Sequence, residues 1–294
     1  MLDNCLTYME SIRKVKVSFK SRATFEGAGV RLKRAFGYAD PSLDPFLLLD
    51  DFHSDNINDY IKGFPWHPHR GIETITYMLH GNIEHGDSLG NGGVIHAGDV
   101  QWMTAGSGII HQEMPKNGPD DTMLWGFQLW ANLPSSHKMM DPRYRELKND
   151  EIPEISLNDG TVKVKIICGE INGTLGPVQD IITEPEYLDI TINPNSEFLH
   201  HIKNGHNVFA YTIEGEGFFD EAKTELIGKE TLIIFREGNT VKISTKNQKV
   251  RFLLISGKPL KEPVAWRGPI VMNTEEELNI AFNEYQNGTF VKHG

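Results

Sequence analysis

The sequence "FPWHPHRGIETITYMLHG", residues 64–81, joins two histidines to a strand-like run that ends at glycine. His67 and His69 are separated by one residue, and Glu73 follows four residues later. From Glu73 to Leu79 the residues alternate as in a strand with one buried face. In a continuous strand, residues two apart face the same side, so the two histidines and Glu73 would project inward together. A glycine between them could interrupt the strand, which leaves the direction of Glu73 open.

Short strand-like runs recur along the rest of the chain. They are rich in Val, Ile, Thr, Tyr and Phe and are separated by Gly, Asn or Asp; examples are residues 162–168, 186–192, 207–213, 231–235, 240–244 and 250–256. This pattern is typical of antiparallel sandwiches and barrels, so it predicts an all-β fold. One helix is predicted within residues 273–288, where Thr274 and Glu277 have capping-box spacing and an apolar stripe follows.

The two halves of the chain are weakly alike. Residues 73–87 resemble residues 207–221, which aligns Tyr77 with Tyr211. In each half a strand ends at glycine, and a second glycine-led strand follows. We therefore predict a duplicated antiparallel β-barrel.

The predicted division between the barrels lies in residues 133–155. This stretch is polar, contains three prolines and lacks a strand pattern. We expect an N-terminal domain over residues 1–140, which carries the candidate metal site, and a C-terminal domain over residues 141–294. Both are of ordinary domain size.

Composition excludes several classes of protein. The chain has 29 basic and 40 acidic residues, a net charge of −11, which argues against a general nucleic-acid binder. No apolar run reaches membrane-spanning length, and the first residues do not have the pattern of a secretory signal. Cys5 and Cys168 are too few for a disulfide framework or a cysteine-based zinc site. We expect a cytoplasmic protein in which histidine and carboxylate hold any metal.

A second pair of candidate ligands lies in "GDVQWMTAGSGIIHQEMP", residues 98–115. His111 and Glu113 are two apart and would face the same side of a strand. Beside His67 and His69, they would supply three imidazoles and one carboxylate, a set that suits Fe(II), Mn, Ni, Cu or Zn. Four ligands on an octahedral ion leave two positions open, as at catalytic metals. Two other interpretations of these residues stay open. They could be polar residues at strand ends that bind no metal, or they could form a structural zinc site.

The second half does not repeat this set. Aligning its glycine-led strand with that of the first half places Val241 and Ile243 at the positions of His111 and Glu113. We therefore expect a metal in the N-terminal barrel and a C-terminal barrel without one.

Three stretches resemble the signature sequences of the pirin family within the cupin superfamily, namely residues 67–81, 98–115 and 124–134. Residues 253–278 are similar to the C-terminal pattern of that family. The resemblance implies a bicupin, that is, two antiparallel β-barrels with a C-terminal helix. It also implies that the N-terminal barrel holds one metal ion, usually iron, with Mn, Ni, Cu, Co or Zn as alternatives.

The family resemblance also implies the roles of individual residues. The metal ligands of the family correspond to His67, His69, His111 and Glu113. Glu73 matches a glutamate that binds the metal in many other cupins. In pirins the later glutamate takes that role, so the function of Glu73 is left open.

Two functions follow from the resemblance. The first is a quercetin 2,3-dioxygenase-type reaction that opens the ring of a flavonol or a related enediol with O2, with Glu113 or Glu73 as general base. The alternative is a non-catalytic regulator that responds to metal and redox state and binds a protein partner, either as a transcriptional coregulator or on a metabolic enzyme. The acidic charge favours a protein partner over DNA. Both functions need the same four ligands, so the sequence does not separate them.

Overall fold

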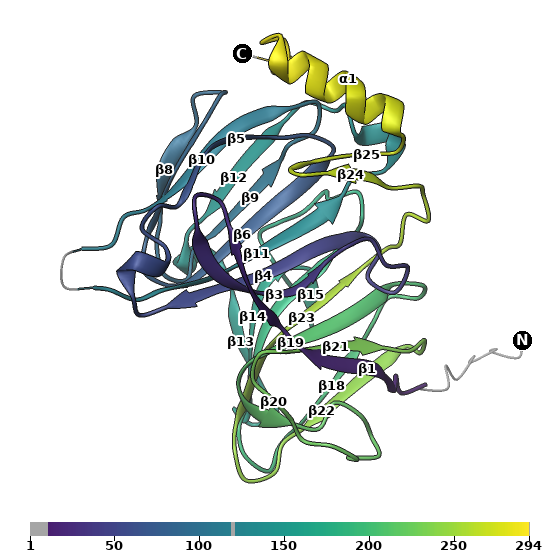
Figure 1. Ribbon diagram of the computed structural model, residues 1–294. Helices are drawn as coiled ribbons and strands as arrows, with labels where there is room; N and C mark the ends of the chain where they lie inside the picture. The colour runs from purple at the N-terminus through teal and green to yellow at the C-terminus, as the bar shows by residue number, and fades with distance from the viewer. Residues whose placement is uncertain (1–10, 119–120, 294) are drawn as a thin grey trace, which may run out of the picture.

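The structure is a computed structural model that describes residues 11–118 and 121–293 (Figure 1). Antiparallel strands dominate these residues, and their one α-helix lies near the C-terminal end. The all-β class and the C-terminal helix predicted from the sequence are therefore confirmed.

The first module consists of two antiparallel sheets. Its large sheet has seven strands in the order β12 (Arg143–Leu147), β9 (Val100–Thr104), β6 (Ile72–His80), β11 (Leu124–Asn132), β4 (Phe46–Ser54), β3 (Val30–Gly37) and β2 (Arg22–Glu26). Its small sheet has four strands in the order β5 (Phe64–His69), β10 (Ile109–Pro115), β7 (Ile83–Asp87) and β8 (Gly92–Ile95). A 3-10 turn, η1 (Ile57–Asp59), lies between β4 and β5.

The second module repeats this plan. Its large sheet follows the order β1 (Val15–Lys20), β21 (Thr231–Phe235), β19 (Asn207–Gly217), β23 (Val250–Gly257), β17 (Glu186–Ile192), β14 (Val162–Cys168) and β13 (Glu154–Leu157), and β20 (Ile227–Gly228) pairs with β19. Two short pairs complete it: β18 (Glu197–His201) with β22 (Thr240–Ser244), and β15 (Glu170–Ile171) with β16 (Thr174–Leu175). The 3-10 turns η2 (Ser135–His137) and η3 (Asn149–Glu151) lie between the modules in sequence.

The two modules exchange their edge strands. β1 precedes the strands of the first module in the chain, but it pairs with β21 of the second. β12 precedes the strands of the second module, but it pairs with β9 of the first. The domain boundary at residue 140 stays a prediction, and both exchanged strands cross it.

The large sheets pack face to face through a shared apolar core. Tyr77 of the first module donates a hydrogen bond to Asp189 of the second at 2.7 Å. Reciprocally, Tyr211 of the second module donates to Asp51 of the first at 2.9 Å. The alignment of Tyr77 with Tyr211 therefore corresponds to a pseudo-twofold relation between the modules.

The end of the chain returns to the first module. After β24 (Ala265–Arg267) and β25 (Ile270–Met272), α1 (Glu275–Gln286) begins at a capping box made by Thr274 and Glu277, as predicted. In Figure 1 this segment lies over the first module. Arg70, which directly follows β5, forms an ion pair with Glu284 of α1 at 2.7 Å. In the described part of the chain, no helix is both long and apolar enough to span a bilayer.

Candidate metal centre

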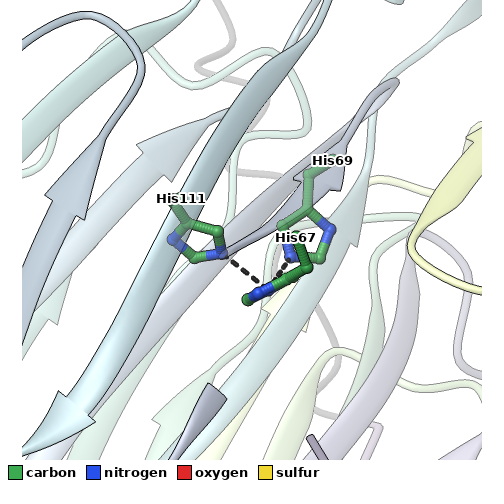
Figure 2. Close-up of side chains that lie close together, drawn as sticks. All are labelled: His67, His69 and His111. Atoms are coloured by element: carbon green, nitrogen blue, oxygen red, sulfur yellow. Dashed lines mark hydrogen bonds between the residues drawn. The ribbon is translucent and has the colours of Figure 1, made fainter. Parts of the chain in front are cut away.

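Three histidines of the first module converge on one point (Figure 2). His67 and His69 lie on β5, and antiparallel pairing of β5 with β10 sets His111 opposite His67. The Nε2 atom of His67 lies 3.1 Å from Nε2 of His69 and 2.9 Å from Nε2 of His111. The predicted approach of the two strands therefore brings the three imidazoles together.

Hydrogen bonds at the opposite ring nitrogens orient two of these imidazoles. Nδ1 of His67 lies 2.8 Å from the carbonyl oxygen of Pro65, and Nδ1 of His69 lies 2.9 Å from that of Pro269. A carbonyl can only accept, so each Nδ1 carries the proton and each Nε2 presents a lone pair. This arrangement is typical of metal-binding histidines, whose second nitrogen donates to a fixed acceptor.

The converging lone pairs fit a cation. Two Nε2 lone pairs 3.1 Å apart repel each other unless a proton or a metal ion lies between them. Ligands in neighbouring positions about 2.1 Å from an octahedral ion lie about 3.0 Å apart, close to the observed separations. Burial lowers the pKa of His67, and it lowers the pKa of His69 and His111 well below the usual value, with the neighbouring imidazoles adding to the shift. The neutral form that binds metal is therefore favoured.

Glu113 lies close to this group on β10. It is fully buried, and its carboxylate accepts hydrogen bonds from Thr76 Oγ1 at 2.8 Å and from Gln128 Nε2 at 3.2 Å. Burial raises the pKa of Glu113 to about 7, and the hydrogen bond from Thr76 partly opposes this shift. The compact nitrogen cluster consists of the three histidines. The role of Glu113 as a fourth ligand stays a prediction.

Glu73 lies on the other face of the sheet. Gly71 has a φ of +77° and resets the alternation between β5 and β6. Ile75 and Tyr77, which share the parity of Glu73, lie in the core between the modules. The direction of Glu73, which the sequence left open, is therefore away from the histidines, because the strand is not continuous through the glycine.

The carboxylate of Glu73 has its own surroundings. Thr104 Oγ1 donates to it at 2.6 Å, and the indole of Trp102 also interacts with the carboxylate. Burial raises its pKa. Glu73 does not line the pocket that contains the histidines.

A pocket of about 560 Å³ opens at the histidines. This volume lies within the range of about 300–1,000 Å³ that is usual for small-molecule sites. His67, His69 and Glu113 line it, together with apolar and aromatic side chains, mainly Leu32, Leu48, Phe52, Phe64, Ile83, Trp130 and Trp266. Trp266 comes from β24, so the returning C-terminal segment closes part of the wall.

A row of polar side chains crosses the inner face of the first large sheet. The strand registers place five residues side by side on β3, β4, β11, β6 and β9: Arg34, Asp50, Gln128, Thr76 and Gln101. The middle of the row holds Glu113, as described above. At one end, Gln101 donates to Nδ1 of the buried His85 at 2.9 Å.

The second module carries an apolar row at the same registers. Its members are all buried in the core of that module: Ile166, Leu188, Leu254, Ala210 and Ile233. In the strand pair β18–β22, His200 lies opposite Val241 and hydrogen-bonds to Glu186 at 3.2 Å. Among the described residues, the one compact group of possible metal ligands lies in the first module.

Sequence reasoning missed several residues of the site. Thr76 and Gln128 occupy alternate strand positions between apolar residues, so correct phasing of the strands would have found them. The carbonyl of Pro269, which is 200 residues away from His69 in the chain, gives no such signal.

Two family models match this chain. The Pirin model matches residues 29–131, and the Pirin C-terminal cupin domain model matches residues 187–291. Human pirin is 42% identical over 284 residues, which cover 95% of this chain and 94% of that protein. A pirin-like protein of Caulobacter vibrioides is 40% identical over 281 residues, with 95% and 99% covered.

A solved structure is similar over nearly the whole chain. The crystal structure of quercetin 2,3-dioxygenase from Acinetobacter baumannii superposes with a TM-score of 0.86 at 30% identity and covers 95% of this chain and 99% of that one. This likeness and the two matching cupin domains confirm the predicted bicupin fold.

Proposed function

The chain belongs to the pirin family, and we propose from this membership that it is a metal-dependent dioxygenase that opens the ring of a flavonol or related enediol with O2. The observation that carries the proposal is the convergence of three histidine Nε2 atoms, two of them on imidazoles oriented by carbonyl acceptors, beside a largely apolar pocket and the buried carboxyl group of Glu113. The similarity to the quercetin 2,3-dioxygenase structure supports the choice of substrate.

In this proposal His67, His69 and His111 hold one divalent ion, with Glu113 as the fourth ligand. Fe(II) is the ion that we propose. When bound, the ion would acidify a substrate hydroxyl and favour its reaction with O2. Both oxygen atoms of O2 would enter the product, so the reaction needs no external reductant.

The residues of the chain bind the substrate and handle its proton. Glu113 is placed to accept this proton because its carboxyl group lines the pocket next to the histidines, and burial raises its pKa in the metal-free protein. Thr76 and Gln128 hold its two oxygens and fix the direction in which it accepts a proton. The apolar pocket walls bind flat aromatic rings and exclude water.

The test is O2 uptake with quercetin, measured with an oxygen electrode. We expect uptake by protein reconstituted with Fe(II), none after chelation, and none for Glu113→Ala reconstituted in the same way. Turnover that is equal with and without metal would contradict the proposal.

One observation favours a second candidate, a metal-dependent regulator that binds a protein partner. Trp66, which lies between Pro65 and His67 on β5, is 53% exposed. Exposed tryptophan is enriched at protein interfaces, and this one adjoins a predicted ligand. A partner whose capture depends on metal oxidation state and is lost in Trp66→Ala, with no turnover of any flavonol, would favour the regulator.

A further inference from the structure

The fold does not require the polar row on the inner face of the first large sheet. The second module builds the same five-strand register with aliphatic residues, as described above. The middle of the polar row holds Glu113, which accounts for Thr76 and Gln128. Arg34 and Asp50, at the other end of the row, do not touch that carboxylate and need a separate explanation.

Arg34 and Asp50 form a bidentate ion pair on the pocket wall. The Nε and Nη2 atoms of Arg34 donate to the two oxygens of Asp50 at 2.8 and 2.7 Å. Asp50 is buried, and both residues line the pocket. Desolvating such a pair offsets most of its attraction, so it adds little stability over apolar side chains. At the equivalent positions, the second module has a pair of apolar side chains, Ile166 and Leu188.

This pair keeps free hydrogen-bonding capacity. Each carboxylate oxygen can accept about two hydrogen bonds, and among the described residues Arg34 is the one donor to each oxygen of Asp50. The Nη1 group of Arg34 has no acceptor in the described part of the chain. Glu26 adds a second carboxylate 2.9 Å from Nη2 of Arg34 at the pocket wall. The three side chains together carry one net negative charge.

We propose that Arg34 and Asp50 form a recognition subsite for a neutral hydroxyl group on an aromatic substrate whose other end lies at the histidines. A hydroxyl group both donates and accepts, which matches the free acceptors of Asp50 and the free donors of Arg34. An anionic substituent is disfavoured, because Glu26 and Asp50 together outweigh the single guanidinium. The substrate class is therefore polyhydroxylated neutral aromatics, and the inference rests on the proposed function.

The position of the subsite suits a substrate of several rings. Asp50 on β4 lies beside Gln128 on β11, which contacts Glu113. Neighbouring strands lie about 4.8 Å apart, so Asp50 is about two strand spacings from Thr76. The wall near Asp50 is apolar, with Leu48 and Phe52 on the same strand. A flat molecule bound at the histidines can extend along this wall and place a ring hydroxyl at the subsite.

The test compares three probes with the metal-loaded protein. Quercetin and 3-hydroxyflavone share the metal-chelating 3-hydroxy-4-keto group, but 3-hydroxyflavone lacks the hydroxyls of the other rings. Sulfonated quercetin adds a negative charge. Quenching of the fluorescence of Trp130 and Trp266, which line the pocket, gives each Kd without requiring turnover. We expect quercetin to bind about 10- to 100-fold more tightly than 3-hydroxyflavone, because this is the usual contribution of a hydrogen bond to a charged group.

The variant Arg34→Ile/Asp50→Leu copies the row of the second module, so we expect it to fold. Its preference for quercetin over 3-hydroxyflavone should fall to about 3-fold or less, since the hydroxyl partners are gone. The control Arg31→Met lies on the same strand, outside the pocket, and should keep the full preference. Glu26→Gln removes one negative charge from the subsite and hardly alters the shape of the side chain. It should therefore improve the binding of sulfonated quercetin relative to that of quercetin.

Each outcome decides a different point. Loss of the preference in the double variant but not in Arg31→Met supports the subsite. An unchanged preference in the double variant, with binding and O2 uptake intact, overturns the subsite and leaves the proposed function standing. Failure of the unaltered metal-loaded protein to bind any of the three probes overturns both.

Discussion

The two modules share the face through which they pack and differ on the face that each encloses. On the packing face, the strand registers give matching rows: Lys33, Asp51, Phe127, Tyr77 and Val100 in the first module, and Lys165, Asp189, Leu253, Tyr211 and Leu232 in the second. On the enclosed face, a polar row in the first module corresponds to an aliphatic row in the second. The shared rows lie at the contact between the modules, and the differing rows distinguish the module that contains the candidate metal centre.

The largest expected effect is on metal binding. His111→Ala removes one of three converging nitrogens, so we expect the metal affinity to fall at least about 100-fold. His200→Ala, in the corresponding strand pair of the second module, should leave metal content unchanged. Metal analysis of dialysed protein checks both. An equal loss of bound metal in the two variants would show that the metal site is not confined to the first module.

The two interface aspartates should respond oppositely to the same substitution. Two hydrogen bonds from Arg251 hold Asp189, at 3.0 and 2.6 Å, so Asp189→Asn leaves a partly buried guanidinium unpaired. We expect a loss of about 2–3 kcal/mol in unfolding free energy, less than for a fully buried pair. Among the described residues no guanidinium donates to Asp51, and burial raises the pKa of Asp51 to about 7, although the hydrogen bond from Tyr211 opposes the shift. Asp51→Asn should therefore stabilise the protein at pH 8.

The pH dependence of this second effect has a definite sign. The pKa of Asp51 is about 7 in the folded protein, and the usual value is 3.8. Between these values folding takes up a proton, so the wild type loses stability as pH rises, and the loss is complete above pH 7. The advantage of Asp51→Asn should be absent near pH 3 and reach a few kcal/mol at pH 8. Urea unfolding at both pH values measures it, and an advantage that shrinks with rising pH would refute the assignment.

A smaller effect is expected at the inner row. Gln128→Leu introduces the residue type that the second module has at the equivalent position, which is Leu254. It removes one of the two hydrogen-bond donors to Glu113. Loss of such an outer hydrogen bond typically costs about 10- to 100-fold in metal affinity or activity. Metal titration and quercetin-dependent O2 uptake should show this loss while the melting temperature changes little. An unaffected protein would mean that the polar row does not support the site.

The smallest effect concerns α1, the C-terminal helix that packs on the first module. Thr274→Ala removes the N-cap of α1 and should cost about 1 kcal/mol. Because α1 packs on the first module, hydrogen exchange should increase around Arg70 and leave the strands of the second module unchanged. Thr289→Ala, beyond the helix, serves as the control. A uniform increase in exchange would show that the modules unfold as one unit.

The sequence predicted the fold class because strand alternation and the capping box at Thr274 are local signals. It also brought His67, His69 and His111 together, since residues two apart on paired strands must share a face. It left the direction of Glu73 open, because the positive φ of Gly71 reverses the phase of the strand, and β25 approaches this glycine so closely that a Cβ atom would clash with the carbonyl of Val271. The inner row was missed because the phase of each strand, and so the direction of its polar residues, was not assigned from the sequence. The carbonyl of Pro269 and the exchange of β1 and β12 depend on contacts between distant parts of the chain, which no local pattern encodes.

The contact between His69 and Pro269 has a consequence for biosynthesis. A chain emerging from the ribosome presents His67, His69 and His111 long before the segment that orients His69 has been made. Until then, the imidazole of His69 lacks the carbonyl that fixes its proton on Nδ1. The orientation of all the predicted ligands would therefore be complete only after the second module and the segment that follows it have been synthesised. An ion captured earlier by the nascent chain would be held by a looser and less selective set of ligands.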